Sequence, residues 1–222
     1  MNRTKTLWAF LGVLIALQFG YPITLYGEWW TAAYMLAYSG MILFGIQIVK
    51  EESSPTIPFY ALAMVMASCG LWFSLDQSNE TAQRLMLTSV GAFQLALLVS
   101  LIAFIVGPKG RATSSHLILA AISAYLLLGG VFAIAFNLLE TFSPGSFVDS
   151  GAPDRPLIWQ GLLYDSYVTL STLGYGDILP VSPWARSLVT LETVTGTLFI
   201  AIVIARLVGA PTEENGDTAT AP

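Results

Sequence analysis

Charged residues are scarce in this chain. Only 10% of its 222 residues are Asp, Glu, Lys or Arg, whereas 55% are hydrophobic and the mean hydropathy is +0.69. One soluble core cannot bury that much apolar surface, so lipid is the expected solvent. The nine Lys and Arg residues are scattered singly along the chain. A basic face that would bind nucleic acid is therefore excluded.

Cysteine and histidine each occur once. Cys69 cannot form an intrachain disulfide, and its expected role is that of a small buried residue. His116 is expected at a membrane interface rather than as a pH sensor. A membrane enzyme needs a nucleophile with a base, or paired acids, at membrane depth. The chain offers no such constellation, so we expect neither an enzyme nor an organic cofactor.

Six long apolar runs stand out instead. Crossing a hydrocarbon core takes about 20 apolar residues in a helix. Backbone groups in lipid must be satisfied within the segment, and no alternating strand pattern is present, so the runs predict helices. The expected fold is all-α transmembrane with six membrane-spanning helices, at residues 7–26, 30–49, 57–75, 85–106, 117–139 and 188–208.

The connection between the fifth and sixth runs, residues 140–187, has a different character. It opens with turn-forming residues, and residues 157–171 then become apolar and aromatic again. Fifteen residues are too few to cross the membrane and return, so they predict a short re-entrant helix. The backbone that follows must be buried in protein or line a watery cavity.

Positive charge predicts the orientation, because Lys and Arg favour cytoplasmic loops. With both termini cytoplasmic, six of the nine lie inside and the re-entrant loop enters from outside. The expected location is the cell membrane. The inside set is Arg3, Lys5, Lys50, Lys109, Arg111 and Arg206, and the outside set is Arg84, Arg155 and Arg186.

Two glycines at alternate positions follow the re-entrant helix. A ring of backbone carbonyls can replace the hydration shell of a potassium ion when consecutive residues point their oxygens the same way. Such a backbone alternates with left-handed dihedrals that glycine adopts at low cost. Gly174 and Gly176 meet that demand. Thr172 can add its hydroxyl as a further ligand, and the Tyr175 ring can pack this segment against the surrounding helices. One chain supplies one wall, so a ring requires a homotetramer.

Residues 163–177 resemble the pore helix and selectivity filter of the tetrameric potassium channel family, close to its small prokaryotic members. The resemblance covers residues 117–209 and rests above all on Thr172-Leu173-Gly174-Tyr175-Gly176-Asp177. It implies K⁺ as the permeant ion. The implied ligands are the carbonyls of Thr172, Leu173, Gly174 and Tyr175 with the Thr172 hydroxyl, and Gly176 completes the ion-binding segment.

Two residues depart from the family pattern. Asp165 stands where relatives place an aromatic residue. Either it accepts a hydrogen bond from Tyr175, within one subunit or across subunits, or it faces water in the outer vestibule. Val168 stands where some bacterial relatives have a buried glutamate. A carboxyl partner for Asp177 is thus missing, and Tyr164 is the better candidate. Asp177, Asp165, Tyr164 and Val168 are therefore the expected filter supports.

The last run carries the remaining candidate residues. Glu192 is costly in lipid and must face protein or water, either bonded to the pore helix or attracting ions directly. Gly196 falls where the family carries its inner-helix hinge, so a gating bend is implied there. Thr197, Ile200 and Ile204 are expected to line the inner pore, where the two isoleucines could form an apolar constriction.

The first four runs resemble a voltage sensor in position only. A sensor needs arginine at every third position, but Leu87, Val90 and Phe93 follow Arg84. Three parts are therefore expected: a four-helix transmembrane domain at 1–114, a pore domain at 115–209, and a disordered cytoplasmic tail at 210–222. The sequence predicts a potassium channel subunit with little or no voltage dependence, embedded in membrane lipid. The alternative is a non-conducting regulatory or assembly subunit.

Overall fold

A computed structural model describes residues 3–50, 57–107 and 114–208. The expected tail at 210–222, and the cytoplasmic charges Lys109 and Arg111, lie outside these ranges. In chain order the elements are α1 (Arg3–Phe19), the 3₁₀ helix η1 (Tyr21–Tyr26), α2 (Glu28–Lys50), α3 (Ile57–Leu75), α4 (Glu80–Val106), α5 (Ser114–Phe142), β1 (Phe147–Asp149), α6 (Trp159–Leu170), β2 (Ile178–Pro180) and α7 (Pro183–Val208).

Local chemistry explains where two of the long helices begin. Asn79 precedes α4, and its side-chain oxygen accepts hydrogen bonds from the amides of Thr81 at 3.0 Å and Ala82 at 3.1 Å. This satisfies two amides that lack partners inside the helix. Helix α7 starts at Pro183, several residues before the predicted 188. Proline suits the first helical turn because its missing amide hydrogen is not needed there.

The first predicted run was wrong in one respect. Residues 7–26 do not form one helix, because α1 ends at Phe19 and η1 takes over at Tyr21. Pro22 causes the break: it cannot donate a backbone hydrogen bond, and it disfavours helical dihedrals at the residue before it.

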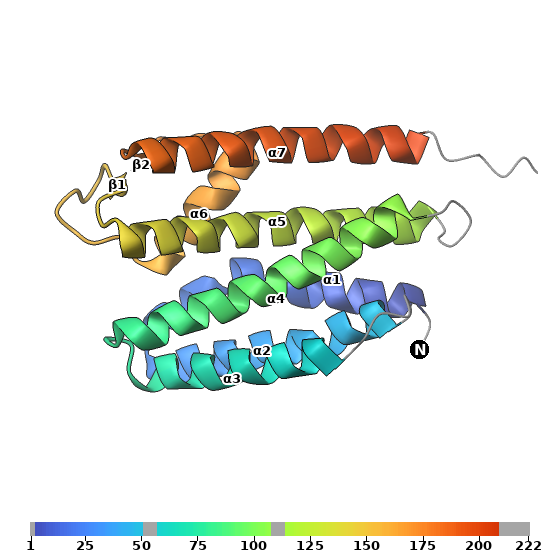
Figure 1. Cartoon of the computed structure of the whole chain (residues 1–222), viewed down its shortest axis with the longest axis horizontal. Helices are drawn as coiled ribbons and strands as arrows, with labels where there is room; N and C mark the ends of the chain where they lie inside the picture. The colour runs from blue at the N-terminus through green and yellow to red at the C-terminus, as the bar shows by residue number, and fades with distance from the viewer. Residues whose placement is uncertain (1–2, 51–56, 108–113, 209–222) are drawn as a thin grey trace, which may run out of the picture.

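The long helices lie side by side, with α7 on one flank and α2 and α3 on the other (Figure 1). Helix α5 is central and packs against α1, α4, α6 and α7. The short helix α6 is inclined between α5 and α7 near one end of the bundle. The start of α1 and the end of α7 both lie at the opposite end of the bundle (Figure 1).

By length and composition, three of the described helices are suited to cross a membrane: Glu80–Val106, Ser115–Phe142 and Pro183–Arg206. The apolar stretches Thr4–Phe19 and Tyr60–Leu75 are shorter. The predicted total of six spans is therefore supported for α4, α5 and α7, and that α1, α2 and α3 cross the membrane stays a prediction. Burial differs sharply among the three long spans, at 67% for α5 but only 11% for α7.

The expectation of a purely helical chain needs a small correction. Strands β1 and β2 pair antiparallel, with Phe147 opposite Pro180 and Asp149 opposite Ile178. Both lie in the connection between α5 and α7, which the turn-forming composition predicted as loop. The pairing joins residues far apart in sequence, so no local pattern announced it. It holds the chain on either side of α6 together.

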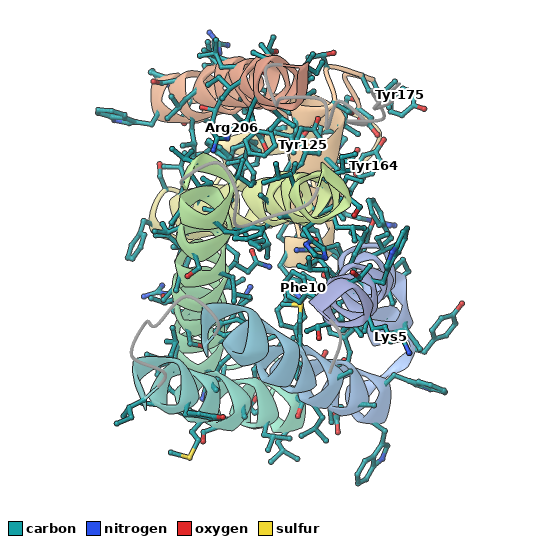
Figure 2. All side chains as sticks on the ribbon, turned by 90° about the vertical axis from the view of Figure 1, so that its right-hand side faces the viewer. Lys5, Phe10, Tyr125, Tyr164, Tyr175 and Arg206 are labelled. Carbon is teal, nitrogen blue, oxygen red and sulfur yellow. The ribbon has the colours of Figure 1, made fainter. Side chains whose placement is uncertain are left out.

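Two contacts tie helices together at the end of the bundle away from α6. Thr4 Oγ1 lies 2.8 Å from His116 Nε2, which links the first turns of α1 and α5. Arg206, near the end of α7, reaches the last turn of α4 (Figure 2). Its guanidinium donates to the carbonyls of Ile105 at 2.6 Å and Gly107 at 2.5 Å, and also to that of Val106.

Arg206 thus caps a helix end with its fixed positive charge. The last carbonyls of a helix lack partners within it and carry partial negative charge. We expect Arg206→Ala to lower the free energy of unfolding by about 1–2 kcal/mol. Arg206→Lys should recover only part of this, because an ammonium lacks the planar fork that serves several carbonyls.

Denaturation of the purified chain in detergent, followed by circular dichroism, measures this effect. Arg155→Ala, at an exposed arginine of the loop before α6, is the control and should leave the stability unchanged. Equal stability of Arg206→Ala and the native chain would show that the cap contributes nothing.

Candidate functional site

The site begins where α6 ends. Ser171 caps the helix, its amide bonding the carbonyl of Tyr167 at 3.1 Å. The chain then leaves the helix, and residues 173–176 have no regular secondary structure. They are also exposed in the single chain. A short helix is therefore present as α6 within the predicted range 157–171, and the glycine-rich segment follows directly. Its re-entrant placement stays a prediction.

The backbone of this segment alternates in handedness. Thr172, Gly174 and Gly176 have φ of +58°, +58° and +73°, whereas the intervening Leu173 and Tyr175 do not have positive φ. The predicted need for left-handed dihedrals at the two glycines is confirmed. Thr172 was not expected to share it, and for a residue with a Cβ this conformation costs about 1–3 kcal/mol.

Hydrogen bonds from the start of the segment return to α6. The amide of Thr172 donates to the carbonyl of Thr169 at 2.9 Å, and that of Leu173 to Val168 at 2.9 Å. The Gly174 amide also reaches the Val168 carbonyl, at 3.4 Å. Val168 therefore supports the segment through its backbone, whatever its side chain. Within the described residues, no hydrogen bond reaches the carbonyl oxygens of residues 172–175.

The outer end of the segment is held from two directions. The Tyr164 hydroxyl donates to Asp177 Oδ2 at 2.8 Å, the contact that the sequence suggested. Ser150 donates to the Asp177 carbonyl through its amide at 2.7 Å and its hydroxyl at 2.8 Å. Sequence reasoning missed Ser150, because only the β1–β2 pairing carries it to this place.

Asp165 lies in the middle of α6 with only 4% of its surface exposed. The alternative in which its carboxylate faces vestibule water is therefore wrong for this chain. Its Oδ2 has no hydrogen-bond partner among the described residues. Tyr175 is 67% exposed and points away from the body of the chain (Figure 2). A bond between the two could only form across subunits, and it stays a prediction.

Glu192 of α7 is fully buried against α6. Ser166 Oγ lies 2.6 Å from Glu192 Oε1 and 2.7 Å from the carbonyl oxygen of Gly129 in α5. The alternative of a structural bond to the pore helix is thus the one realised. A serine hydroxyl carries one hydrogen. Both contacts are hydrogen bonds only when the Glu192 carboxyl is protonated and donates to Ser166.

The last carbonyl of α6 is also tightly surrounded. The Tyr125 hydroxyl donates to the Leu170 carbonyl at 3.0 Å. Gly196 of α7 lies so close that an added Cβ would sit 2.7 Å from Leu170 Cδ1 and 3.1 Å from its carbonyl oxygen. Glycine at 196 therefore permits close packing. Helix α7 continues through this position, so the hinge role stays a prediction.

The three candidate pore-lining residues of α7 share an exposed position. Thr197, Ile200 and Ile204 are all exposed in the single chain, and the Thr197 hydroxyl bonds only its own helix, at the Thr193 carbonyl. Exposed apolar side chains cover much of this helix. The described site is therefore one uncovered strand beside one uncovered helix, arranged around α6.

The comparisons with known proteins agree with this geometry. A sequence family described as "Ion channel" matches residues 120–213. The potassium channel protein kcv of Paramecium bursaria Chlorella virus 1 is 32% identical over 72 residues, which cover 31% of this chain and 76% of that protein. This chain belongs to the potassium channel family. It is an ion channel protein of a membrane and not an enzyme.

Two larger potassium channels are also similar. The inward rectifier potassium channel Kirbac3.1 of Paramagnetospirillum magnetotacticum is 34% identical over 82 residues, 35% of this chain and 24% of that protein. The two pore potassium channel c of Oryza sativa subsp. japonica is 35% identical over 85 residues, 38% of this chain and 17% of that protein. The chain thus spans a quarter or less of these relatives. No solved structure matches it.

The Ser166–Glu192 contact yields a prediction for this channel. Glu192→Gln keeps a donor for Ser166 Oγ and should preserve the fold. Glu192→Ala should lower the free energy of unfolding by about 1–3 kcal/mol, because Ser166 loses one of its two partners in a buried place. Denaturation in detergent measures both.

A double-variant cycle with Ser166→Ala provides the control. Once the hydroxyl is absent, Glu192→Ala should cost less, because the two residues act as a pair. Additive losses would contradict a direct bond between them.

Proposed function

We propose that this chain is one subunit of a homotetrameric pore that conducts potassium passively and selects it over sodium. One observation carries the proposal: the segment after α6 alternates in handedness at Thr172, Gly174 and Gly176, while the carbonyl oxygens of residues 172–175 are left without partners in the described chain. Four such strands around one axis would surround a dehydrated cation with oxygen atoms.

The uncovered surface of α7 supports assembly. Its span is only 11% buried, against 67% for α5. Leu191, Leu198 and Ile202 are among its exposed apolar side chains. A helix of this composition needs lipid or protein around it, and a fourfold arrangement would place one of its faces on the axis and another against a neighbour.

Within this pore, each residue has the role that its place along the ion pathway gives it. The carbonyls of Thr172, Leu173, Gly174 and Tyr175 and the Thr172 hydroxyl coordinate K⁺, with Gly176 at the outer end. Asp177 and Tyr164 brace the outer mouth, Val168 anchors the strand, and Asp165 accepts a hydrogen bond from Tyr175 of a neighbouring subunit. The carbonyl end of α6, with its partial negative charge, favours a cation below the filter. Thr197, Ile200 and Ile204 line the inner pore, and Gly196 permits the gating bend.

Weak voltage dependence is part of the proposal. Helix α4 contains a single basic residue, Arg84, which pairs with Glu80 of the same helix at 3.0 Å. The third positions that follow are buried and apolar: Leu87, Val90 and Phe93. One exposed arginine cannot carry the several charges that steep opening requires. Residues 1–114 therefore serve as a scaffold in the cell membrane, with both termini in the cytoplasm.

Potassium flux from liposomes that hold the purified chain tests conduction. Gly174→Ala should reduce the flux at least about tenfold, because alanine disfavours left-handed dihedrals by roughly 1–2 kcal/mol and would displace the carbonyls. Gly145→Ala is the matched control, since Gly145 also has positive φ, at +82°, but lies in the outer loop. Sodium in place of potassium should give little flux, and barium should block it.

Three outcomes would contradict the proposal. If native mass spectrometry shows a monomer, the chain cannot form a ring of four subunits. If Gly174→Ala leaves the potassium flux unchanged, residues 172–176 do not form the selectivity filter. Absence of flux from a correctly folded tetramer favours the non-conducting regulatory or assembly subunit instead.

Recording in planar bilayers tests the voltage dependence. Moving one charge across 100 mV is worth about 2.3 kcal/mol, so a channel without moving charges should show no steep change of open probability over roughly ±100 mV. Arg84→Gln should leave this shallow relation unchanged. A steep relation that Arg84→Gln abolishes would identify α4 as a sensor after all.

A further inference from the structure

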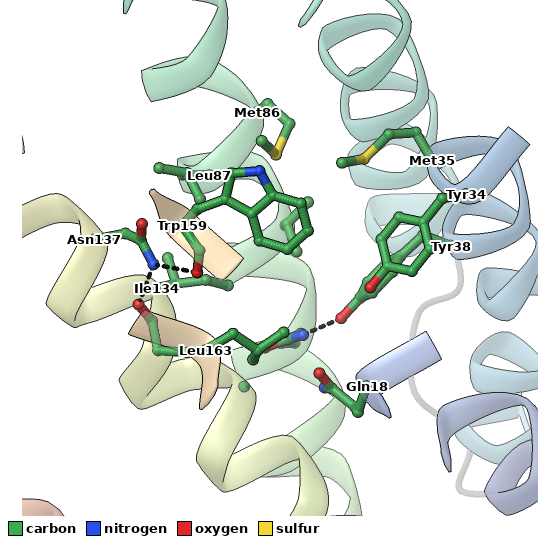
Figure 3. Close-up of a pocket in the computed structure, with 14 residues that line it drawn as sticks. Gln18, Tyr34, Met35, Tyr38, Met86, Leu87, Ile134, Asn137, Trp159 and Leu163 are labelled. Carbon is green, nitrogen blue, oxygen red and sulfur yellow. Dashed lines mark hydrogen bonds between the residues drawn. The ribbon is translucent and has the colours of Figure 1, made fainter. Parts of the chain in front are cut away.

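A cavity lies among α1, α2, α4, α5 and the first half of α6 (Figure 3). Its 14 lining residues are uncharged and mostly apolar, and they include Trp159 and Leu163 of α6. Its volume is about 50 Å³, on the measure by which one water molecule requires roughly 10–15 Å³. The cavity therefore has room for more than one water molecule.

Two glutamine side chains line this apolar space. Gln18 of α1 and Gln94 of α4 are 1% and 2% exposed. Gln94 Nε2 donates to the Tyr38 hydroxyl, and Figure 3 shows Gln18 on the same side of the cavity as this bond. Gln18 Nε2, which lies close to the Tyr38 hydroxyl, and Gln94 Oε1 have no hydrogen-bond partner in good geometry among the described residues. Buried amide atoms without partners are unfavourable, and native structures normally satisfy them.

A glycine of α5 brings the two amides together. A Cβ added at Gly130 would meet the amide atoms of Gln94 and would lie 2.6 Å from Gln18 Nε2. The side chains of Gln18 and Gln94 therefore occupy the space that the side chain of any residue larger than glycine would need at position 130. The donor and the acceptor come from different helices and converge over a third, so the tertiary fold builds this pair.

The two unpartnered atoms define the chemistry of an occupant. It must accept a hydrogen bond from Gln18 Nε2 and donate one to Gln94 Oε1. A hydroxyl does both, because it has one hydrogen and two lone pairs. A carboxylate cannot donate, an ammonium cannot accept, and the uncharged lining would stabilise neither.

We propose that this cavity binds a small uncharged alcohol or phenol whose hydroxyl bridges Gln18 and Gln94 and whose apolar body lies among the methionine, leucine and Trp159 side chains. Water shares the hydroxyl but not the apolar body, and the experiment separates the two. The site goes beyond the proposed function. Its binding can be measured whether or not the chain conducts.

The test uses the full chain in detergent with two probes of nearly the same shape, phenol and toluene. Ligand-observed NMR titration gives the affinity of each. Phenol should bind at least about tenfold more tightly than toluene, because only phenol can satisfy both amides.

Variants then locate the site. In the double variant Gln18→Leu, Gln94→Leu, the preference for phenol over toluene should vanish, a loss of about tenfold or more. Gly130→Ala should weaken phenol binding by pushing the amides away. Gln83→Leu makes the same chemical change on α4 outside the cavity and should leave phenol binding unchanged. Should the double variant fail to fold, the phenol-to-toluene ratio of the native chain still decides.

Three results would overturn the proposal. One is equal binding of phenol and toluene by the native chain. Another is a preference for phenol that survives in a folded double variant. The third is a high-resolution density map, recorded at saturating phenol, in which ordered water alone fills the cavity.

Discussion

The structure of this channel depends on one backbone constraint. Carbonyl oxygens can surround an ion only if they are not already bonded, yet a backbone at membrane depth must still satisfy its amides. The first half of the segment after α6, residues 172–174, meets both demands. The amides of Thr172, Leu173 and Gly174 return to the last carbonyls of α6, and left-handed dihedrals at alternate residues leave the strand's own carbonyls free. The left-handed backbone conformation of Thr172 is energetically unfavourable, but this geometry requires it.

The rest of the pore region holds α6 in place, because the strand inherits its position from that helix. Helix α7 contacts α6 through Glu192 and Ser166, and α5 contacts its end through Tyr125 and Leu170. The loop between α5 and α6 contacts Asp177 through Ser150 and is held there by the β1–β2 pairing. Each of these bonds is buried or spans elements distant in sequence, so their loss would disturb the strand without touching it.

Helices α1–α4 differ from the region that matches the channel family. They carry neither the match to the channel family nor a ladder of charges, and they pack mainly on α5. This part of the chain also contacts α6, where Gln160 donates to Thr24 of η1 at 3.0 Å, and α7, where Arg206 joins the end of α7 to the end of α4. Motion at the C-terminal end of α7 must therefore break this contact or move the end of α4 with it, so the contact links the two helices physically.

The sequence by itself determined the features that depend on local composition: the apolar runs, the short length of α6, the spacing of Gly174 and Gly176, and the lone arginine of α4. It also suggested the bond between Tyr164 and Asp177. Only the tertiary structure decided the features that join distant segments. A hydrogen bond between side chains far apart in sequence leaves no periodic pattern, and burial of one polar group depends on which helix covers it. The β1–β2 pairing, the Ser150 contact, the burial of Asp165, the Ser166–Glu192 bond, the Arg206 cap and the convergence of Gln18 and Gln94 over Gly130 all belong to this second class.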